Sequence, residues 1–189
     1  MRRIGIFAGS FDPIHDGHLA IAQSAVEYLE LDSLFFMVEK SPWSDKKPAQ
    51  FEHRKVMVEL ATKKFPRISQ LEISDERFDL KTTLPKIEIL YPGSELYFIF
   101  GADVFIRMDS KQWPNLNKLL AHYIAVFERN EITEQHITER AKSLGIVVAI
   151  LPSKYLEHSS TDVRLQPNRS SLWVPKDVAK FIAENSLYK

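Results

Sequence analysis

The sequence predicts a doubly wound α/β fold, in which helices cover both faces of a parallel sheet. Short apolar runs alternate along the chain with segments whose apolar residues recur at helical spacing. Several of the apolar runs are continuous, which is typical of strands that are buried on both faces of a parallel sheet. The composition is that of a globular protein, with 44% hydrophobic and 26% charged residues in a chain of 189.

The first expected strand is RIGIFAG, at residues 3–9, and the apolar residues from 19 to 29 then recur at helical spacing. A second strand is expected at 34–39, LFFMVE. After a polar loop that runs through Lys47, the apolar positions within 56–61 predict another helix.

The next candidate strand is ISQLEI, at residues 68–73. Threonine at 82 or 83, with Pro85 just inside, indicates the start of a helix that carries apolar residues to position 90. The turn YPGSE follows, and ELYFIFG at 95–101 is then expected to be a central strand.

The segment WPNLNKLLAH, at residues 113–122, is expected to be helical or irregular, and YIAVFE at 123–128 to be a second central strand. A charged helix is expected over 133–144, because Gly145 is a plausible stop. The apolar run IVVAIL, at 146–151, completes a set of five or six strands.

Two helices are expected to close the chain, STDVR at 160–164 and VPKDVAKFIAEN at 174–185, the second with Pro175 in its first turn. No internal repeat or long linker divides the sequence, so we expect a single domain over residues 1–189. In doubly wound sheets, ligands bind beyond the carboxyl ends of the strands, where the strand order reverses. The loop after the first strand is therefore a candidate binding site.

Charge and cysteine content exclude several classes of function. Lysine plus arginine and aspartate plus glutamate each number 25, so no overall charge favours nucleic acid or an anionic membrane. The absence of cysteine excludes disulfides, thiolate zinc sites and cysteine nucleophiles. No apolar stretch approaches the roughly 20 residues of a membrane span, and no signal-peptide pattern is present. We expect a soluble, cytoplasmic protein that binds neither nucleic acid nor a membrane.

The loop after the first strand, GSFDPIHDGH at 9–18, has the features of a phosphate site. A strand, a turn of small residues and a helix start direct backbone N–H groups and the positive end of the helix dipole to one place. His15 and His18 are three residues apart, so both rings can reach one anion. Alternatively, one histidine caps or packs locally and the other is exposed. A metal site is disfavoured, since two histidines without a third ligand make an incomplete coordination sphere.

Two motifs resemble those of a known family. GSFDPIHDGH resembles the [GS]-x-F-D-P-x-H-x-G-H loop of the nucleotidylyltransferase superfamily, whose H-x-G-H signature also occurs in class I aminoacyl-tRNA synthetases. HSSTDVR, at 158–164, resembles the second signature, usually I-S-S-T-x-[IV]-R, and differs at His158. The stretch 83–116 and the ending VPKDVAKFIAENSLY resemble bacterial nicotinate-nucleotide adenylyltransferases, so the resemblance covers essentially the whole chain.

The resemblance implies a Rossmann-like enzyme of NAD biosynthesis that transfers AMP from ATP to nicotinate mononucleotide, with Mg²⁺ bound alongside ATP and pyrophosphate leaving. It leaves the oligomeric state open, including a homo-oligomer. The implied attacking group is a phosphate with a second pKa of about 6, so it is largely dianionic at neutral pH and needs no general base.

The resemblance also implies roles for residues of the first motif. His18 would contact the α-phosphate of ATP in the transition state. His15 would hold the phosphates together with the backbone of Gly9, Ser10 and Phe11.

The second motif would bind the triphosphate through Ser159, Ser160 and Thr161, while Arg164 would neutralise charge on the leaving group. A plain helix cap explains the same serine and threonine residues, and both readings can hold at once.

Two further groups of residues are implied on either side of these motifs. Gly101 and Asp103, in the family's G-x-D pattern, are expected near the adenosine ribose, although an aspartate at this position also suits a helix cap. The mononucleotide is expected to contact four residues that a packed core or a solvated surface would equally explain: Trp113, Arg129, Thr83 and Lys46. No metal ligand is expected from the protein.

The sequence departs from the family where it usually has a P-P-H-K-like element. Here Trp43 follows Pro42, and lysines come only at Lys46 and Lys47. Lys40, Arg54 and these two lysines are candidates to supply positive charge to a phosphate, on a loop that is either solvated or a lid.

The departure leaves nicotinamide mononucleotide and phosphopantetheine as alternative acceptors. A non-catalytic nucleotide-binding regulatory module is the alternative from another functional class. It is disfavoured because both histidines and the Ser-Ser-Thr and Arg elements occur together.

Overall fold

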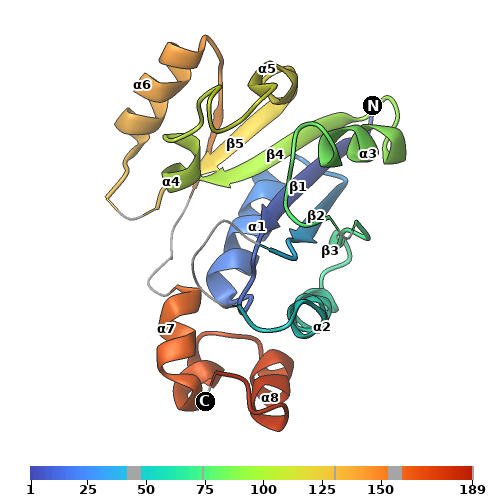
Figure 1. Ribbon diagram of the computed structural model, residues 1–189, viewed down its shortest axis with the longest axis vertical. Coiled ribbons are helices and arrows are strands. Elements are labelled where there is room, and N and C mark those ends of the chain that lie inside the picture. The colour runs from blue at the N-terminus through green and yellow to red at the C-terminus, as the bar shows by residue number, and fades with distance from the viewer. Residues whose placement is uncertain (42–47, 74, 130, 153–158, 189) are drawn as a thin grey trace.

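The computed structural model describes residues 1–41, 48–73, 75–129, 131–152 and 159–188. Within these ranges six parallel strands form one sheet in the order β3-β2-β1-β4-β5-β6 (Figure 1). The strands are β1 (Arg3–Gly9), β2 (Ser33–Val38), β3 (Ile68–Gln70), β4 (Glu95–Gly101), β5 (Tyr123–Phe127) and β6 (Ala149–Leu151). The predicted doubly wound α/β class is therefore confirmed, and the strand order reverses between β1 and β4.

Helices cover both faces of this sheet. They are α1 (Asp16–Tyr28), α2 (Phe51–Thr62), α3 (Thr83–Leu90), α4 (Ala102–Phe105), α5 (Leu116–Leu119), α6 (Glu134–Leu144), α7 (Ser160–Leu165) and α8 (Lys176–Glu184), with a 3₁₀ helix η1 (Pro167–Leu172). Residues of α1, α2 and α8 join one buried apolar cluster with one face of the sheet. Residues of α3, α4, α5 and α6 join a second cluster on the other face. Two separate layers of core thus enclose the strands.

The edges of the sheet are shorter than the apolar runs predict. Strand β3 ends at Gln70, because it pairs only with residues 34–36 of β2. Strand β6 begins at Ala149 rather than at 146, and Val147 is 95% exposed. Apolar sequence by itself does not make a strand at an edge, where pairing to one neighbour decides the length. The sequence analysis also missed the 3₁₀ helix η1, and it considered the short helix α4 only through a possible cap at Asp103.

The C-terminal elements lie beyond the carboxyl end of β1, below the sheet in the view of Figure 1. Helix α8 packs against α2, and the backbone N–H of Asp16 donates to the carbonyl of Trp173 at 2.8 Å. These contacts hold the C-terminal elements against α2 and the start of α1. No helix in the described ranges combines the length and apolar composition needed to cross a lipid bilayer.

Candidate active site

The candidate site lies at the carboxyl ends of the adjacent strands β1 and β4, which end at Gly9 and Gly101. The chain leaves β1 toward α1 on one face of the sheet and leaves β4 toward α4 on the other. Such a divergence opens a crevice between the two connections.

The loop after β1 is held in a strained conformation by aromatic packing. Phe11 is 2% exposed and has φ of 45°, in the left-handed region that non-glycine residues rarely adopt. Its ring makes edge contacts with Phe7 and Phe36, at centroid distances of 5.6 and 5.0 Å. A Cβ on Gly9 would approach this ring to 3.1 Å. The small residue at 9 and the aromatic residue at 11 therefore fix the loop together.

His15 and His18 are joined at the start of α1. His15 is the N-cap, and its backbone N–H donates to Nδ1 of His18 at 3.2 Å. Because Nδ1 of neutral His18 accepts this bond, its proton resides on Nε2. The two rings lie 3.7 Å apart between centroids.

The electrostatic environment keeps His18 in this neutral form. Burial, the neighbouring His15 and the charge of Arg129 lower the pKa of His18 well below its usual range. His15 is 4% exposed and His18 is partly buried, so the alternative in which one of the two is exposed is wrong. The arrangement provides a neutral N–H donor at Nε2.

The second motif forms the start of α7. Ser159 is the N-cap, and its Oγ accepts from the backbone N–H of Asp162 at 3.3 Å. The carboxylate of Asp162 accepts in return from the N–H and the hydroxyl of Ser159, at 2.6 and 2.7 Å. The capping interpretation of these residues is therefore confirmed.

Direct hydrogen bonds join the two motifs. The hydroxyl of Ser160 donates to the carbonyl of Pro13 at 2.9 Å. Arg164 donates from Nη1 to the carbonyl of Asp12 at 2.6 Å and from Nη2 to Oγ1 of Thr161 at 3.0 Å. Segments nearly 150 residues apart in sequence thus form one surface.

Asp103 and Arg129 lie on the β4 side of this surface. Nη1 of Arg129 is 3.9 Å from Oδ2 of Asp103, while Oδ1 of Asp103 is buried with no hydrogen-bond partner. A Cβ on Gly101 would lie 2.6 Å from that Oδ1, so the glycine makes room for the carboxylate. The alternative that Asp103 caps the next helix is wrong, because Gly101 occupies the N-cap of α4.

The other residues expected to contact the mononucleotide are not gathered in the same way. The Thr83 side chain is fully buried, and its hydroxyl donates to Oδ2 of Asp75 at 2.8 Å. Trp113 is partly buried and meets Phe100 edge-on, at a centroid distance of 5.9 Å. Lys46, like Lys47 and Trp43, lies outside the described residues.

Arg54 has a role that the sequence analysis missed. Its side chain is fully buried and donates to the carbonyls of Ala49, Ser10, Glu39 and Lys40, at distances between 2.6 and 2.9 Å. These bonds tie together the loops that follow β1 and β2. The expectation that Arg54 offers its charge to a phosphate is wrong for this conformation, since carbonyl oxygens occupy its donors.

Asp12 and Tyr188 were also missed, although both lie in stretches that carry the family resemblance. Asp12 is 4% exposed, and its Oδ1 accepts from the backbone N–H of Ala49 at 3.0 Å and from the Tyr188 hydroxyl at 2.8 Å. Neither residue type in isolation signals such a contact, because the two are 176 positions apart.

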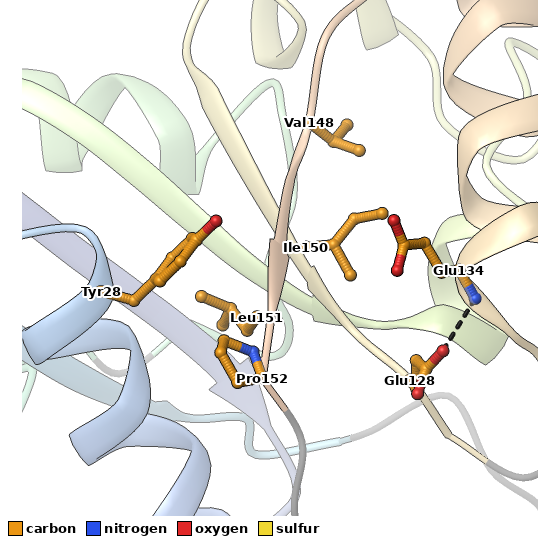
Figure 2. A pocket seen from close by; sticks show the side chains of 7 residues that line it. All are labelled: Tyr28, Glu128, Glu134, Val148, Ile150, Leu151 and Pro152. Atoms are coloured by element: carbon orange, nitrogen blue, oxygen red, sulfur yellow. Dashed lines mark hydrogen bonds between the residues drawn. The ribbon is translucent and has the colours of Figure 1, made fainter.

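No group of three or more histidine, cysteine, aspartate or glutamate side chains in the described ranges is arranged to hold a metal ion. A hollow of about 470 Å³ lies elsewhere, over the β6 edge, with Tyr28 on the α1 side and Glu134 on the α6 side (Figure 2). None of the residues of the candidate phosphate site lines it.

Comparison with known proteins agrees with this geometry. The family model described as cytidylyltransferase-like matches residues 6–166. A protein of Clostridium botulinum named probable nicotinate-nucleotide adenylyltransferase is 38% identical over 100% of this chain and 99% of its own length. One of the same name from Clavibacter michiganensis is 33% identical over 99% and 94%.

Solved structures show the same fold. The nicotinic acid mononucleotide adenylyltransferase of Plasmodium falciparum complexed with NaAD superposes with a TM-score of 0.80, at 18% identity, over 100% of this chain and 98% of that one. The same enzyme complexed with APC gives a TM-score of 0.76 at 19% identity, with the same coverage of both chains.

Proposed function

The chain belongs to the cytidylyltransferase-like family, among relatives named nicotinate-nucleotide adenylyltransferase, and we propose that it transfers AMP from ATP to nicotinate mononucleotide. The products are nicotinate adenine dinucleotide and pyrophosphate, so the reaction belongs to NAD biosynthesis. We also propose that residues 1–189 act as a single domain in the cytoplasm.

The observation that carries this proposal is the junction of the two motifs. Ser160 and Arg164 bond to the backbone of Pro13 and Asp12, directly before the two histidines. The Nε2–H of neutral His18 and the guanidinium of Arg164 therefore lie beside the same loop at the strand-order reversal, which suits a polyphosphate. A module that only binds a mononucleotide would not require both sequence motifs.

The reaction is an in-line displacement at the α-phosphorus of ATP. A phosphate oxygen of the acceptor forms the new P–O bond, and the bond from the α-phosphorus to the bridging oxygen breaks, with its electrons leaving on pyrophosphate. The acceptor is already anionic, so the protein supplies no general base. Nε2–H of His18 donates to the α-phosphate as its charge redistributes, and Arg164 neutralises the leaving group.

Nucleotidyltransferases of this kind generally use a divalent metal with ATP. We propose Mg²⁺, which keeps several waters and is commonly held by substrate phosphates together with one or two carboxylates. Asp103 is a candidate to contribute a carboxylate, since its Oδ1 is buried with no hydrogen-bond partner among the described residues, and it is equally suited to accept from a ribose hydroxyl. When bound, the ion supplies additional neutralisation of the phosphate charge.

The mononucleotide is proposed to occupy the β4 and β5 side of the crevice. Arg129 suits its phosphate, and Trp113 with Phe100 offers an aromatic surface for a pyridine ring. We also propose that Lys46 contacts the mononucleotide, whereas Thr83 supports this side of the site from within, because it is fully buried, its hydroxyl donates to Asp75 and its backbone N–H donates to Asp79.

Pyrophosphate release from ATP and Mg²⁺ tests the function, with nicotinate mononucleotide, nicotinamide mononucleotide and phosphopantetheine compared in parallel. We expect the highest kcat/KM with nicotinate mononucleotide. A preference for another acceptor would retain the chemistry and reject the substrate. No release with any of the three, in protein that binds ATP, would instead favour the nucleotide-binding module.

A further inference from the structure

The carboxylate of Asp12 is an unusual feature of the phosphate loop, because it is almost completely buried and yet belongs to a loop that binds a ligand. A buried carboxylate is stable only when donors or opposite charges surround it. Its Oδ1 accepts from the N–H of Ala49 and from the hydroxyl of Tyr188, while Oδ2 lies 3.6 Å from Nη1 of Arg164. The backbone and side chain of Asp12 therefore both face Arg164.

Tyr188 reaches Asp12 from the segment that follows α8. Two backbone residues there, Ser186 and Tyr188, have left-handed φ values of 51° and 64°, which turn the chain back toward the loop. The Tyr188 ring packs against the apolar cluster of α1, α2 and α8. Burial and the adjacent carboxylate of Asp12 raise the pKa of the phenol, so it remains a hydrogen donor.

The hydrogen bond gives the phenol a role that ring packing does not require. Ring packing places the aromatic group, whereas the hydroxyl selects the orientation of the Asp12 carboxylate. That carboxylate accepts from the backbone N–H of Ala49, which precedes α2. The backbone carbonyl of the same residue, Asp12, accepts from Arg164. Loss of the hydroxyl would leave the ring in place and remove one of the two described hydrogen bonds that Oδ1 of Asp12 accepts, so the carboxylate would be less firmly oriented.

We propose that Tyr188 is a positioning residue of the phosphate site, acting through Asp12 to hold Arg164 and the loop before His15 in the arrangement that binds the triphosphate. The proposal deepens the proposed function and rests on the assignment of ATP to this site. It predicts an effect on the ATP end of the crevice, because neither Trp113 nor Arg129 is joined to Tyr188 by a hydrogen bond within the described residues.

The first test compares Tyr188→Phe with Tyr97→Phe. Tyr97 is a matched control, since its hydroxyl also donates to a carboxylate, Oε2 of Glu95, at 3.4 Å, but β1 and β4 are paired there near their amino ends. The dissociation constant of α,β-methylene-ATP with Mg²⁺ is measured by calorimetry, together with KM for both substrates and the melting temperature.

In Tyr188→Phe we expect about tenfold weaker binding of the ATP analogue and a similar rise in KM for ATP. The KM for the acceptor should change by less than about twofold, and Tyr97→Phe should leave all three constants unchanged within the same margin. Equal behaviour of the two variants in analogue binding would overturn the proposal. A change in both substrate KM values by one common factor would do the same, because it would indicate a general structural effect.

A double-mutant cycle with Asp12→Asn tests the route through Asp12. If Tyr188 acts through this carboxylate, Tyr188→Phe should add less than about twofold to the loss of analogue binding in Asp12→Asn. Full additivity would overturn the proposed route. Analogue binding needs no acceptor, so a wild-type protein that binds the analogue but releases no pyrophosphate would refute the proposed function and still leave this cycle interpretable.

Discussion

Two helices of this protein begin with the same local structure and differ in everything around it. In α1 the backbone N–H of His15 donates to Nδ1 of His18, and in α6 the backbone N–H of Thr133 donates to Nδ1 of His136. Both bonds measure 3.2 Å, and in each case the histidine is the third residue of its helix. The hydrogen bond between the N-cap residue and the histidine therefore has the same length at the start of both helices.

The surroundings of the two histidines are not alike. His18 is partly buried against Phe7 and Phe11, at the carboxyl end of a central strand. His136 is exposed and belongs to α6, the helix that connects β5 to the edge strand β6. In both helices the cap thus uses Nδ1 of the histidine, and the rest of the ring can join a binding site only where the fold brings other donors to it.

The strongest test of this comparison replaces each histidine by alanine. We expect His18→Ala to lower kcat about a hundredfold to a thousandfold, because it removes a donor to charge that develops in the transition state. His136→Ala, which breaks the same type of cap, should change kcat by less than about twofold. Steady-state pyrophosphate release measures both, and similar losses in the two variants would show that capping rather than location is responsible.

A second test removes a buried support of the loop that leads from β1 into α1. Arg54→Met leaves four carbonyl oxygens without their buried donor, so the free energy of unfolding should fall by about 3 kcal/mol. Denaturant unfolding measures the change. Lys180→Met, at an exposed site of α8, is the control and should stay within about 0.5 kcal/mol. A loss below about 1 kcal/mol for Arg54→Met would mean that water replaces the lost donors.

A third change lies away from both histidine caps. Trp113→Ala should raise the KM for nicotinate mononucleotide about tenfold, through the loss of aromatic contact with the pyridine ring. The KM for ATP should change by less than about twofold, and Trp113→Phe should restore much of the affinity. Equal changes in both KM values would indicate that Trp113 only fills the core beside Phe100.

The smallest expected effect concerns the titration of His18. Its pKa in the folded state is well below the 6.5 of an unfolded histidine, so the unfolded chain binds more protons just below pH 6.5. The stability present above pH 6.5 is therefore lost as the pH falls toward the lowered pKa, at up to about 1 kcal/mol per pH unit. His18→Gln, whose amide oxygen can accept from His15, should show a shallower decline between pH 6.5 and 5. Parallel declines would contradict the burial of this ring.

Much of the fold was predictable because its signals are local. The continuous apolar runs at 95–101 and 123–128 are central strands as expected, and Gly145 ends α6 in a left-handed conformation with φ of 68°. The edges were less predictable, since β3 and β6 extend only as far as one neighbouring strand pairs with them. Helix α4 is only four residues long, which is too short for a periodic pattern to reveal it.

The residues of the candidate site likewise fall into two groups, those that a local motif predicts and those that depend on distant partners. The motif around His15 and His18 and the cap at Ser159 are each contained within about ten residues, so the sequence could indicate them directly. By contrast, the buried role of Arg54, the engagement of the Thr83 hydroxyl and the contact of Tyr188 with Asp12 depend on partners in other elements. No local pattern encodes those partners.

By itself, the sequence determined the fold class, the two candidate phosphate-binding motifs and the family to which they belong. Tertiary structure alone decided which of two similar histidine caps lies at the carboxyl end of a central strand, and that Arg54 serves the scaffold. The physical reason is that capping and strand formation depend on neighbours within a few residues, whereas the burial of a charge depends on donors and acceptors that the whole chain brings together.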